Sequence, residues 1–167
     1  MKHILRSLIL LAVFSFFSKE SIAQLDTKHA IGVRFGSSSG ITYRHTLSED
    51  RAFEGILGFQ SNSKYKRTRL VGLYQYHKPL ANDFSWYYGF GGSIGSFKYK
   101  SYRDGNGNQV DPNSEISLSV DGVVGIEYHV PGAPLALSLD VKPYFDFIQE
   151  STIRVIDPIG FSIRYKF

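Results

Sequence analysis

The sequence predicts an all-β protein, a closed eight-stranded antiparallel transmembrane β-barrel whose strands follow one another in an up-and-down meander. Three observations predict this fold. Apolar and polar side chains alternate along repeated segments, which is the pattern of strands with two different faces. The chain has 15% aromatic residues and 16 glycines, a composition that suits a barrel. Beyond the first residues, no apolar stretch approaches the roughly 20 residues that a spanning helix needs.

The N-terminal segment, residues 1–23, has the three parts of a secretory signal peptide. It starts with basic residues, continues with an apolar run from Leu8 to Phe17, and ends in a short polar stretch before Gln24. The apolar run is about half as long as a membrane anchor requires. We therefore expect cleavage before Gln24 and a single barrel domain over residues 24–167.

Cysteine usage and charge narrow the possible functions. The chain has no cysteine, so no disulfide and no lipidated N-terminal cysteine is expected. Without residues 1–23, the chain keeps 16 basic and 14 acidic residues. This near balance, with no clustered basic face, predicts no nucleic-acid partner.

Alternation and turn residues divide the chain into eight segments, each about as long as the 9 to 11 residues of a tilted transmembrane strand, or longer. Their approximate ranges are 29–37, 39–47, 52–61, 67–77, 84–98, 115–129, 135–146 and 153–167. The connections 48–50, 79–83 and 131–134 are short, whereas 100–114 is the longest. Because outer-membrane barrels have short periplasmic turns and longer outer loops, both termini are expected on the periplasmic side.

The two faces of these segments differ sharply. One is apolar and aromatic, as in Ile31, Val33 and Phe35, and the other carries charged residues among glycines. Bulky apolar side chains in such number would overfill an eight-stranded lumen, so the apolar face is expected to point outward, into lipid. The inward face is expected to hold a matched charge network, because buried charges need partners. Its predicted members are Arg34, Arg44, Glu54, Asp121, Glu127, Asp140, Lys142 and Arg164. Pairing Leu47 with Arg51 predicts that Arg44 and Glu54 lie opposite each other.

The last strand carries a further signal. From Phe161 to Phe167 apolar and polar residues alternate strictly, and aromatic residues occupy the last and third-last positions, Phe167 and Tyr165. This ending resembles the sorting signal that the barrel-assembly machinery reads in outer-membrane proteins. The resemblance implies a Gram-negative outer membrane and Tyr165 and Phe167 as an assembly signal.

Several segments together resemble one family. They are GITYRH (40–45), EGILGF (54–59), GLYQYHKPL (72–80), WYYGFGGSIG (86–95), DGVVGIEY (121–128) and LSLDVKP (137–143). They resemble small outer-membrane β-barrel proteins of the OmpA-like, porin-like type, over nearly all of residues 24–167. The resemblance implies an eight-stranded barrel in the outer membrane and brings no catalytic motif.

The only arrangement similar to an active site lies on the inward face. It comprises Ser117, Ser119, Asp121, Glu127 and His129 on one segment and His77 on another. Because a nucleophile needs its base within hydrogen-bond reach, we expect no catalytic residues. His129 and Glu127 are two residues apart, but two ligands do not make a metal site. Residues 104–111 lack the ligand spacing of a calcium loop. No metal and no cofactor is therefore expected.

Basic residues gather where the second and third outer loops are expected. A solvated rim is the simpler interpretation of such a cluster, and contact with the phosphates of lipopolysaccharide is the functional one. The candidate contacts are Lys64, Lys66, Arg67, Arg69, Lys98, Lys100 and Arg103.

Together these patterns predict an integral, monomeric outer-membrane barrel with a structural or surface-interaction role and no catalytic activity. Its expected partners are outer-membrane lipid, lipopolysaccharide and, during biogenesis, the barrel-assembly machinery. Two alternatives remain open: a narrow pore for ions or very small solutes, and a lipid A-modifying enzyme.

Overall fold

The computed structural model describes residues 27–36, 38–61, 65–100, 102–103, 109–110, 114–147, 153–154 and 159–167. The expected signal peptide, 1–23, lies outside these residues, as do Lys64 and most of the segment 104–111. Among the described residues, no helix is long and apolar enough to cross a membrane.

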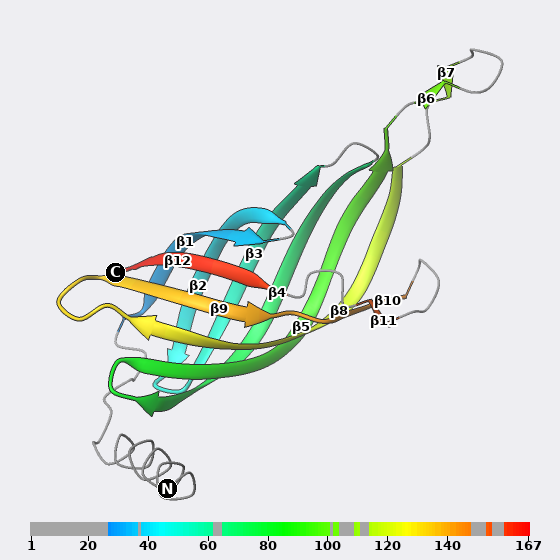
Figure 1. Ribbon diagram of the computed structural model, residues 1–167. Coiled ribbons are helices and arrows are strands. Elements are labelled where there is room, and N and C mark those ends of the chain that lie inside the picture. Colours follow the sequence, from blue (N-terminus) through cyan, green and yellow to red (C-terminus); the bar gives the residue numbers. More distant parts are fainter. Residues whose placement is uncertain are drawn as a thin grey trace, which may run out of the picture.

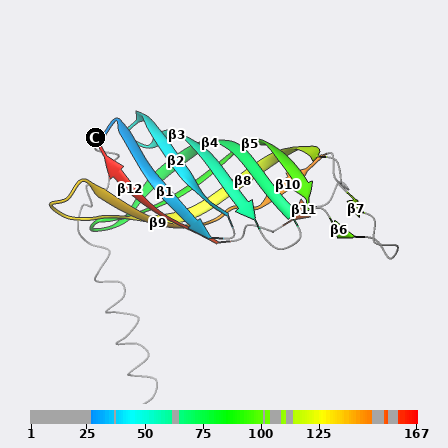
Figure 2. The same cartoon turned by 90° about the horizontal axis from the view of Figure 1, so that it is seen from above.

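The chain forms a closed eight-stranded antiparallel barrel, and the predicted fold class is confirmed. Eight strands follow one another around the wall, and hydrogen bonding between the first and the last closes it (Figures 1 and 2). In order around the barrel they are β1 (His29–Gly36), β2 (Ser39–Ser48), β3 (Arg51–Ser61), β4 (Tyr65–Ala81), β5 (Phe84–Tyr99), β8 (Ser114–His129), β9 (Leu135–Val141) and β12 (Gly160–Lys166).

Two of the predicted segments are interrupted. The seventh consists of β9 and β10 (Tyr144–Asp146), separated by Lys142 and Pro143. Proline has no N–H to donate to the ladder, yet the Gly122 N–H still donates to the Pro143 carbonyl, at 2.9 Å. The eighth consists of β11 (Ile153–Arg154), which pairs with β10, and β12, which pairs with β9 and β1.

The longest expected loop contains a small hairpin that the sequence pattern did not indicate. β6 (Tyr102–Arg103) pairs with β7 (Gln109–Val110) as a separate two-stranded sheet. Figures 1 and 2 show this hairpin beyond the ends of β5 and β8, away from the barrel wall.

The barrel wall is much taller on one side. β4 has 17 residues and β5 and β8 have 16 each, whereas β1 has eight; β9 and β12 have seven each, and β10 and β11 continue their segments. In Figure 1 the long strands rise past the short ones at the end opposite the tight turns. We call the end with the turns at 49–50, 82–83 and 131–134 the turn side, and the opposite end the loop side.

Side-chain orientation follows the alternation of the sequence. In β3, Phe53, Leu57 and Phe59 are exposed, while Ala52 and Glu54 are buried. The same pattern leaves large apolar side chains exposed on every long strand and buries charged ones in the lumen. A closed sheet that is apolar outside and charged inside reverses the usual arrangement of a water-soluble protein.

Candidate functional site in the barrel lumen

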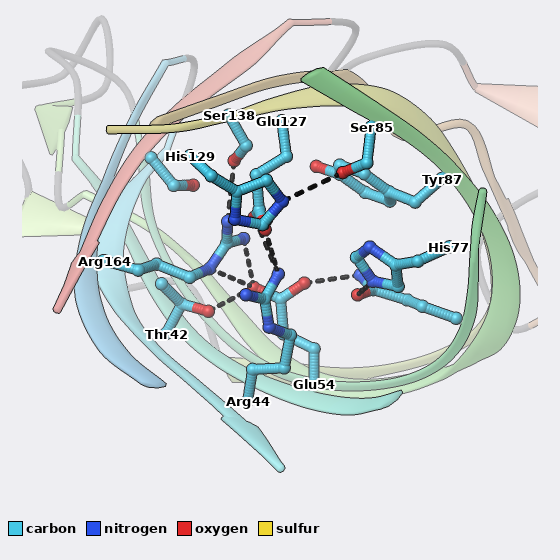
Figure 3. Close-up of polar contacts among 12 residues, drawn as sticks. Thr42, Arg44, Glu54, His77, Ser85, Tyr87, Glu127, His129, Ser138 and Arg164 are labelled. Carbon is cyan, nitrogen blue, oxygen red and sulfur yellow. Dashed lines mark hydrogen bonds and ion pairs between the residues drawn. The ribbon is translucent and has the colours of Figure 1, made fainter. Parts of the chain in front are cut away.

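The turn-side half of the lumen is filled by four charged side chains, Arg44, Glu54, Glu127 and Arg164, which we call the turn-side network (Figure 3). Arg44 Nη1 donates to both carboxylate oxygens of Glu127, at 2.8 and 2.6 Å. Arg164 joins the two acids, because its Nη1 lies 3.0 Å from Glu127 and its Nη2 lies 2.5 Å from Glu54. Two arginines therefore neutralise two carboxylates across the barrel.

Polar neighbours add hydrogen bonds to this network, although Arg44 Nε has no partner among the described residues. The Thr42 hydroxyl and the Gln75 amide both donate to Glu54, and Arg164 donates to the Ser138 hydroxyl at 2.7 Å. His77 lies at the edge, with Nε2 3.3 Å from the Gln75 amide oxygen. A buried ion pair is stable only when its remaining donors and acceptors are also satisfied, and here several uncharged residues serve that purpose.

A second ion pair joins β1 and β9 over the strand between them, β12. Arg34 on β1 donates through Nη1 and Nη2 to the two oxygens of Asp140 on β9, at 2.7 and 2.5 Å. The Tyr87 hydroxyl on β5 donates to the same carboxylate at 2.8 Å. Such a bidentate arginine pair fixes geometry as well as charge.

Between the turn-side network and the loop side, the strands β3, β4, β5 and β8 contribute an apolar cluster, which we call the apolar collar. It consists of Ile56, Val71, Leu73, Tyr87 and Val123. These inward-facing apolar residues were not among those expected in the lumen, where the sequence pattern emphasised charge.

The loop-side half holds a different group, Arg67, Arg69, Asp121, Lys142 and Tyr144, which we call the loop-side cluster. Arg69 Nη2 lies 3.0 Å from Asp121, and Lys142 Nζ lies 3.9 Å from the same oxygen. Arg67 donates to the Tyr144 hydroxyl at 2.9 Å, and both arginines lie over the Tyr144 ring, 5.0 and 4.0 Å from its centroid. Two cations of this cluster therefore converge on Asp121, and the third is held by an aromatic residue.

The structure places all eight predicted network residues inside the barrel. Arg44 and Glu54 are register partners, as expected, but Arg51 pairs with Ser48 rather than Leu47, because the register shifts between Thr46 and Ser48. The ion partners of Arg44 and Glu54 also differ from their strand neighbours. Each binds a residue across the lumen, so strand register alone does not reveal the pairing.

The basic residues expected at the outer rim divide into two groups. Lys66, Lys98 and Lys100 are exposed. Arg69 is buried and Arg67 half-buried, and both bind groups inside the barrel, contrary to the expectation for an outward rim. Leu70 on the same strand points outward. Arg69 and Arg67 lie one and three residues before it, at positions that face inward, so the alternation of the strand would have placed them inside the barrel. Lys64 and the side chain of Arg103 lie outside the described part.

The serine and histidine candidates do not form a triad. Ser117 and Ser119 are buried, and their hydroxyls have no hydrogen-bond partner among the described residues. His129 Nε2 instead lies 3.2 Å from Ser85 and 3.6 Å from Glu127, so both contacts use one ring nitrogen. In a catalytic triad the acid orients the histidine through its other nitrogen.

Metal ligands are equally sparse in the described part of the chain. His129 and Glu127 do approach each other, but no group of three or more histidine, cysteine or acidic residues that could hold a metal forms among the residues that the structure describes.

Comparisons with known proteins add information on the fold. No family model and no curated protein matches the chain. Among solved structures, the N-terminal β-barrel domain of Pseudomonas aeruginosa OprF has a TM-score of 0.60 and 9% identity, covering 83% of this chain and 95% of that one. Neisserial surface protein A (NspA) has a TM-score of 0.56 and 15% identity, covering 83% and 93%. At such low identity these similarities establish a shared fold, the closed eight-stranded antiparallel barrel.

Proposed function

We propose that this chain is an integral outer-membrane β-barrel with a structural or surface-interaction role and no catalytic activity. The observation that carries the proposal is the inverted polarity of a closed barrel. Large apolar side chains such as Ile41, Phe90 and Ile116 are more than half exposed, while Glu54, Glu127 and Arg164 are almost fully buried. A contiguous apolar surface of this extent is stable in hydrocarbon, where closure also satisfies the backbone.

The membrane orientation follows from the unequal ends. Short turns belong to the periplasmic side of outer-membrane barrels and longer connections to the outside. Both described ends, Thr27 and Phe167, lie on the turn side, where the His29 N–H donates to the Phe167 carbonyl at 3.0 Å. The proposed surface role, though not this orientation, is supported by the similarity to Neisserial surface protein A.

A surface role fits the exposed lysines of the loop side. Lys66 on β4 pairs in register with Lys98 on β5, and Lys100 follows β5. Adjacent cations repel each other unless anions lie between them, and the phosphates of lipopolysaccharide supply such anions. We therefore propose that Lys66, Lys98 and Lys100 contact the lipopolysaccharide layer, with Arg67 and Arg69 now excluded from this rim.

The alternative of a narrow pore is supported only by the presence of a polar lumen. The turn-side network and the apolar collar both occupy that lumen, and apolar side chains inside a narrow lumen oppose the passage of ions. Planar-bilayer recording on the folded barrel separates the two functions.

The membrane assignment is tested by the depth dependence of charged substitutions. Leu57, near the middle of β3, faces outward, and Leu47, beside the first turn, is its matched control. Leu57→Arg should destabilise the barrel in phospholipid vesicles by about 2–4 kcal/mol, and Leu47→Arg by about 0–1 kcal/mol. Reversible urea unfolding followed by tryptophan fluorescence measures both values.

Equal effects of the two substitutions would refute the transmembrane assignment. So would a monomeric native protein that stays in solution without detergent. Overexpression with unchanged lipid A mass spectra would independently exclude the lipid-modifying alternative.

A further inference from the structure

Three polar side chains meet on the outer surface of the turn side, on the neighbouring strands β1 and β2 (Figure 1). His29 is the first residue of β1 and the register partner of His45, near the end of β2. Tyr43 lies two residues before His45, and the alternation of β2 places both on the outward face. We call these three residues the histidine–tyrosine cluster.

The nitrogen and oxygen atoms of the cluster converge. His29 Nδ1 lies 2.8 Å from the Tyr43 hydroxyl oxygen and 3.3 Å from His45 Nδ1. The two imidazole rings are also close, with centroids 4.9 Å apart and planes inclined by 32°. One ring nitrogen therefore faces two further atoms that can act as metal ligands, each from a different residue.

These separations match those between neighbouring ligand atoms of a four-coordinate metal ion. With metal–nitrogen bonds of about 2.0–2.1 Å, two ligand atoms lie about 3.3–3.4 Å apart in a tetrahedron and about 2.8–3.0 Å apart at adjacent corners of a square. The two distances measured in the cluster fall in these ranges. Imidazole is moreover a preferred ligand of zinc and copper. An ion bound by all three atoms therefore requires little movement of the side chains.

The backbone around the cluster is well fixed. The His29 N–H donates to the Phe167 carbonyl at 3.0 Å, and the Phe167 ring stacks on the His29 imidazole with centroids 5.6 Å apart. On the other strand, the Thr46 N–H donates to the Lys28 carbonyl at 2.9 Å, which ties β2 to the residue before His29. The ligand atoms are thus held on two strands whose register is set by the barrel itself.

The cluster is also accessible from outside the barrel. His29 and His45 are half-buried, and Tyr43 is exposed. Lys28, the charged residue next to His29 in sequence, is exposed, so its long side chain can hold the ammonium group away from a bound cation. In the orientation proposed above, the cluster lies where the wall meets periplasmic water. An ion can reach it there without entering the lumen.

We propose that the histidine–tyrosine cluster binds a divalent transition-metal ion, zinc or copper, through Nδ1 of His29, Nδ1 of His45 and the hydroxyl oxygen of Tyr43. Water completes the coordination. The sequence predicted no metal, because the ligands are distributed over two strands and the third one is a tyrosine; strand register brings them together. This site goes beyond the surface role proposed above and rests on the geometry of one strand pair.

The test uses the untagged barrel, folded in a non-ionic detergent without chelators, into which Zn²⁺ and Cu²⁺ are titrated separately by calorimetry. His29→Gln and His45→Gln each remove one imidazole ligand. His129→Gln is the control, because it removes a histidine that approaches Glu127 in the lumen, away from the cluster. Far-ultraviolet circular dichroism and gel mobility verify that every variant is folded.

We expect one ion to bind per barrel. His29→Gln and His45→Gln should each weaken binding about tenfold or more, and His129→Gln should leave it nearly unchanged. Tyr43→Phe should have a smaller effect than either, because both imidazoles remain. In the Cu²⁺-loaded barrel, electron paramagnetic resonance should show coupling to two imidazole nitrogens, and to one in each variant of His29 or His45. A role in packing alone would not produce that change.

Three results would overturn the site: no binding of either ion to the unaltered barrel, unchanged binding in both cluster variants, or a loss of binding in His129→Gln alone. If His29→Gln does not fold, because it lies beside Phe167 at the closure of the barrel, His45→Gln and the Cu²⁺ spectrum decide. The depth dependence of Leu57→Arg tests the membrane assignment separately, so the failure of one proposal is distinguishable from the failure of the other.

Discussion

The two halves of the lumen use the same chemistry, arginine against carboxylate, with different outcomes. In the turn-side network, Arg44 and Arg164 face Glu54 and Glu127, so the charges cancel. In the loop-side cluster, Arg69 and Lys142 share one carboxylate, Asp121, and Arg67 relies on an aromatic hydroxyl. The first arrangement pairs two arginines with two carboxylates, whereas in the second two cations converge on one carboxylate and a third is held by a hydroxyl and a ring.

The largest expected effect comes from removing the arginine that links both turn-side acids. Arg164→Met leaves Glu54 without its cation and should destabilise the barrel by about 3–5 kcal/mol. Arg69→Met is the matched change in the loop-side cluster, where Lys142 still faces Asp121, and should cost about 1.5–3 kcal/mol. Urea unfolding in detergent compares the two, and a greater loss for Arg69→Met would reverse our interpretation of the halves.

Measurements of ion conductance test whether the turn-side half of the lumen is closed to ions. We expect no steady conductance from the unaltered barrel in planar bilayers, because the turn-side network and the apolar collar fill the lumen. A steady current that disappears when Arg44 and Glu54 are exchanged would support the pore instead. Exchange of the exposed pair Asp50 and Arg51, whose ion pair lies at the turn, serves as the control.

The smallest thermodynamic effect is expected at the outer surface of the turn side. Phe167→Ala removes ring contacts to His29 and Tyr165, with centroids 5.6 and 6.3 Å apart, and should cost less than about 1.5 kcal/mol. As part of a proposed assembly signal, the same change should reduce the amount of folded barrel in cells much more than this loss explains. Comparable stability and cellular yield would argue that Phe167 acts only through packing.

Strand alternation predicted much of this structure. Because period-two patterns are local, they located the eight wall segments and assigned residues such as Arg34 and Asp140 to the inside. The partners within the lumen depend on how the wall curves, and residues far apart in sequence meet there, as Glu54 and Arg164 do. No local pattern contains that information.

Some features were accessible in the sequence and were not used. Arg67 and Arg69 have the inward parity of Gln75 and His77 on the same strand, but the neighbouring lysines suggested one exposed basic cluster. Pro143 likewise signals the interruption between β9 and β10, because it cannot donate to the ladder. The hairpin of β6 and β7 is too short for a periodic pattern to reveal it.

The unequal wall gives the barrel a distinct front and back when it is viewed along its axis. At about 3.3 Å per residue, β4 has a contour of about 56 Å and β1 of about 26 Å. Lipids on the two flanks would therefore meet apolar belts of different height, and the bilayer would adapt by thinning or by tilting the barrel. Neighbouring membrane proteins would then favour one flank over the other. The rotation of this barrel about its own axis, and not only its depth in the bilayer, would therefore affect how it packs among them.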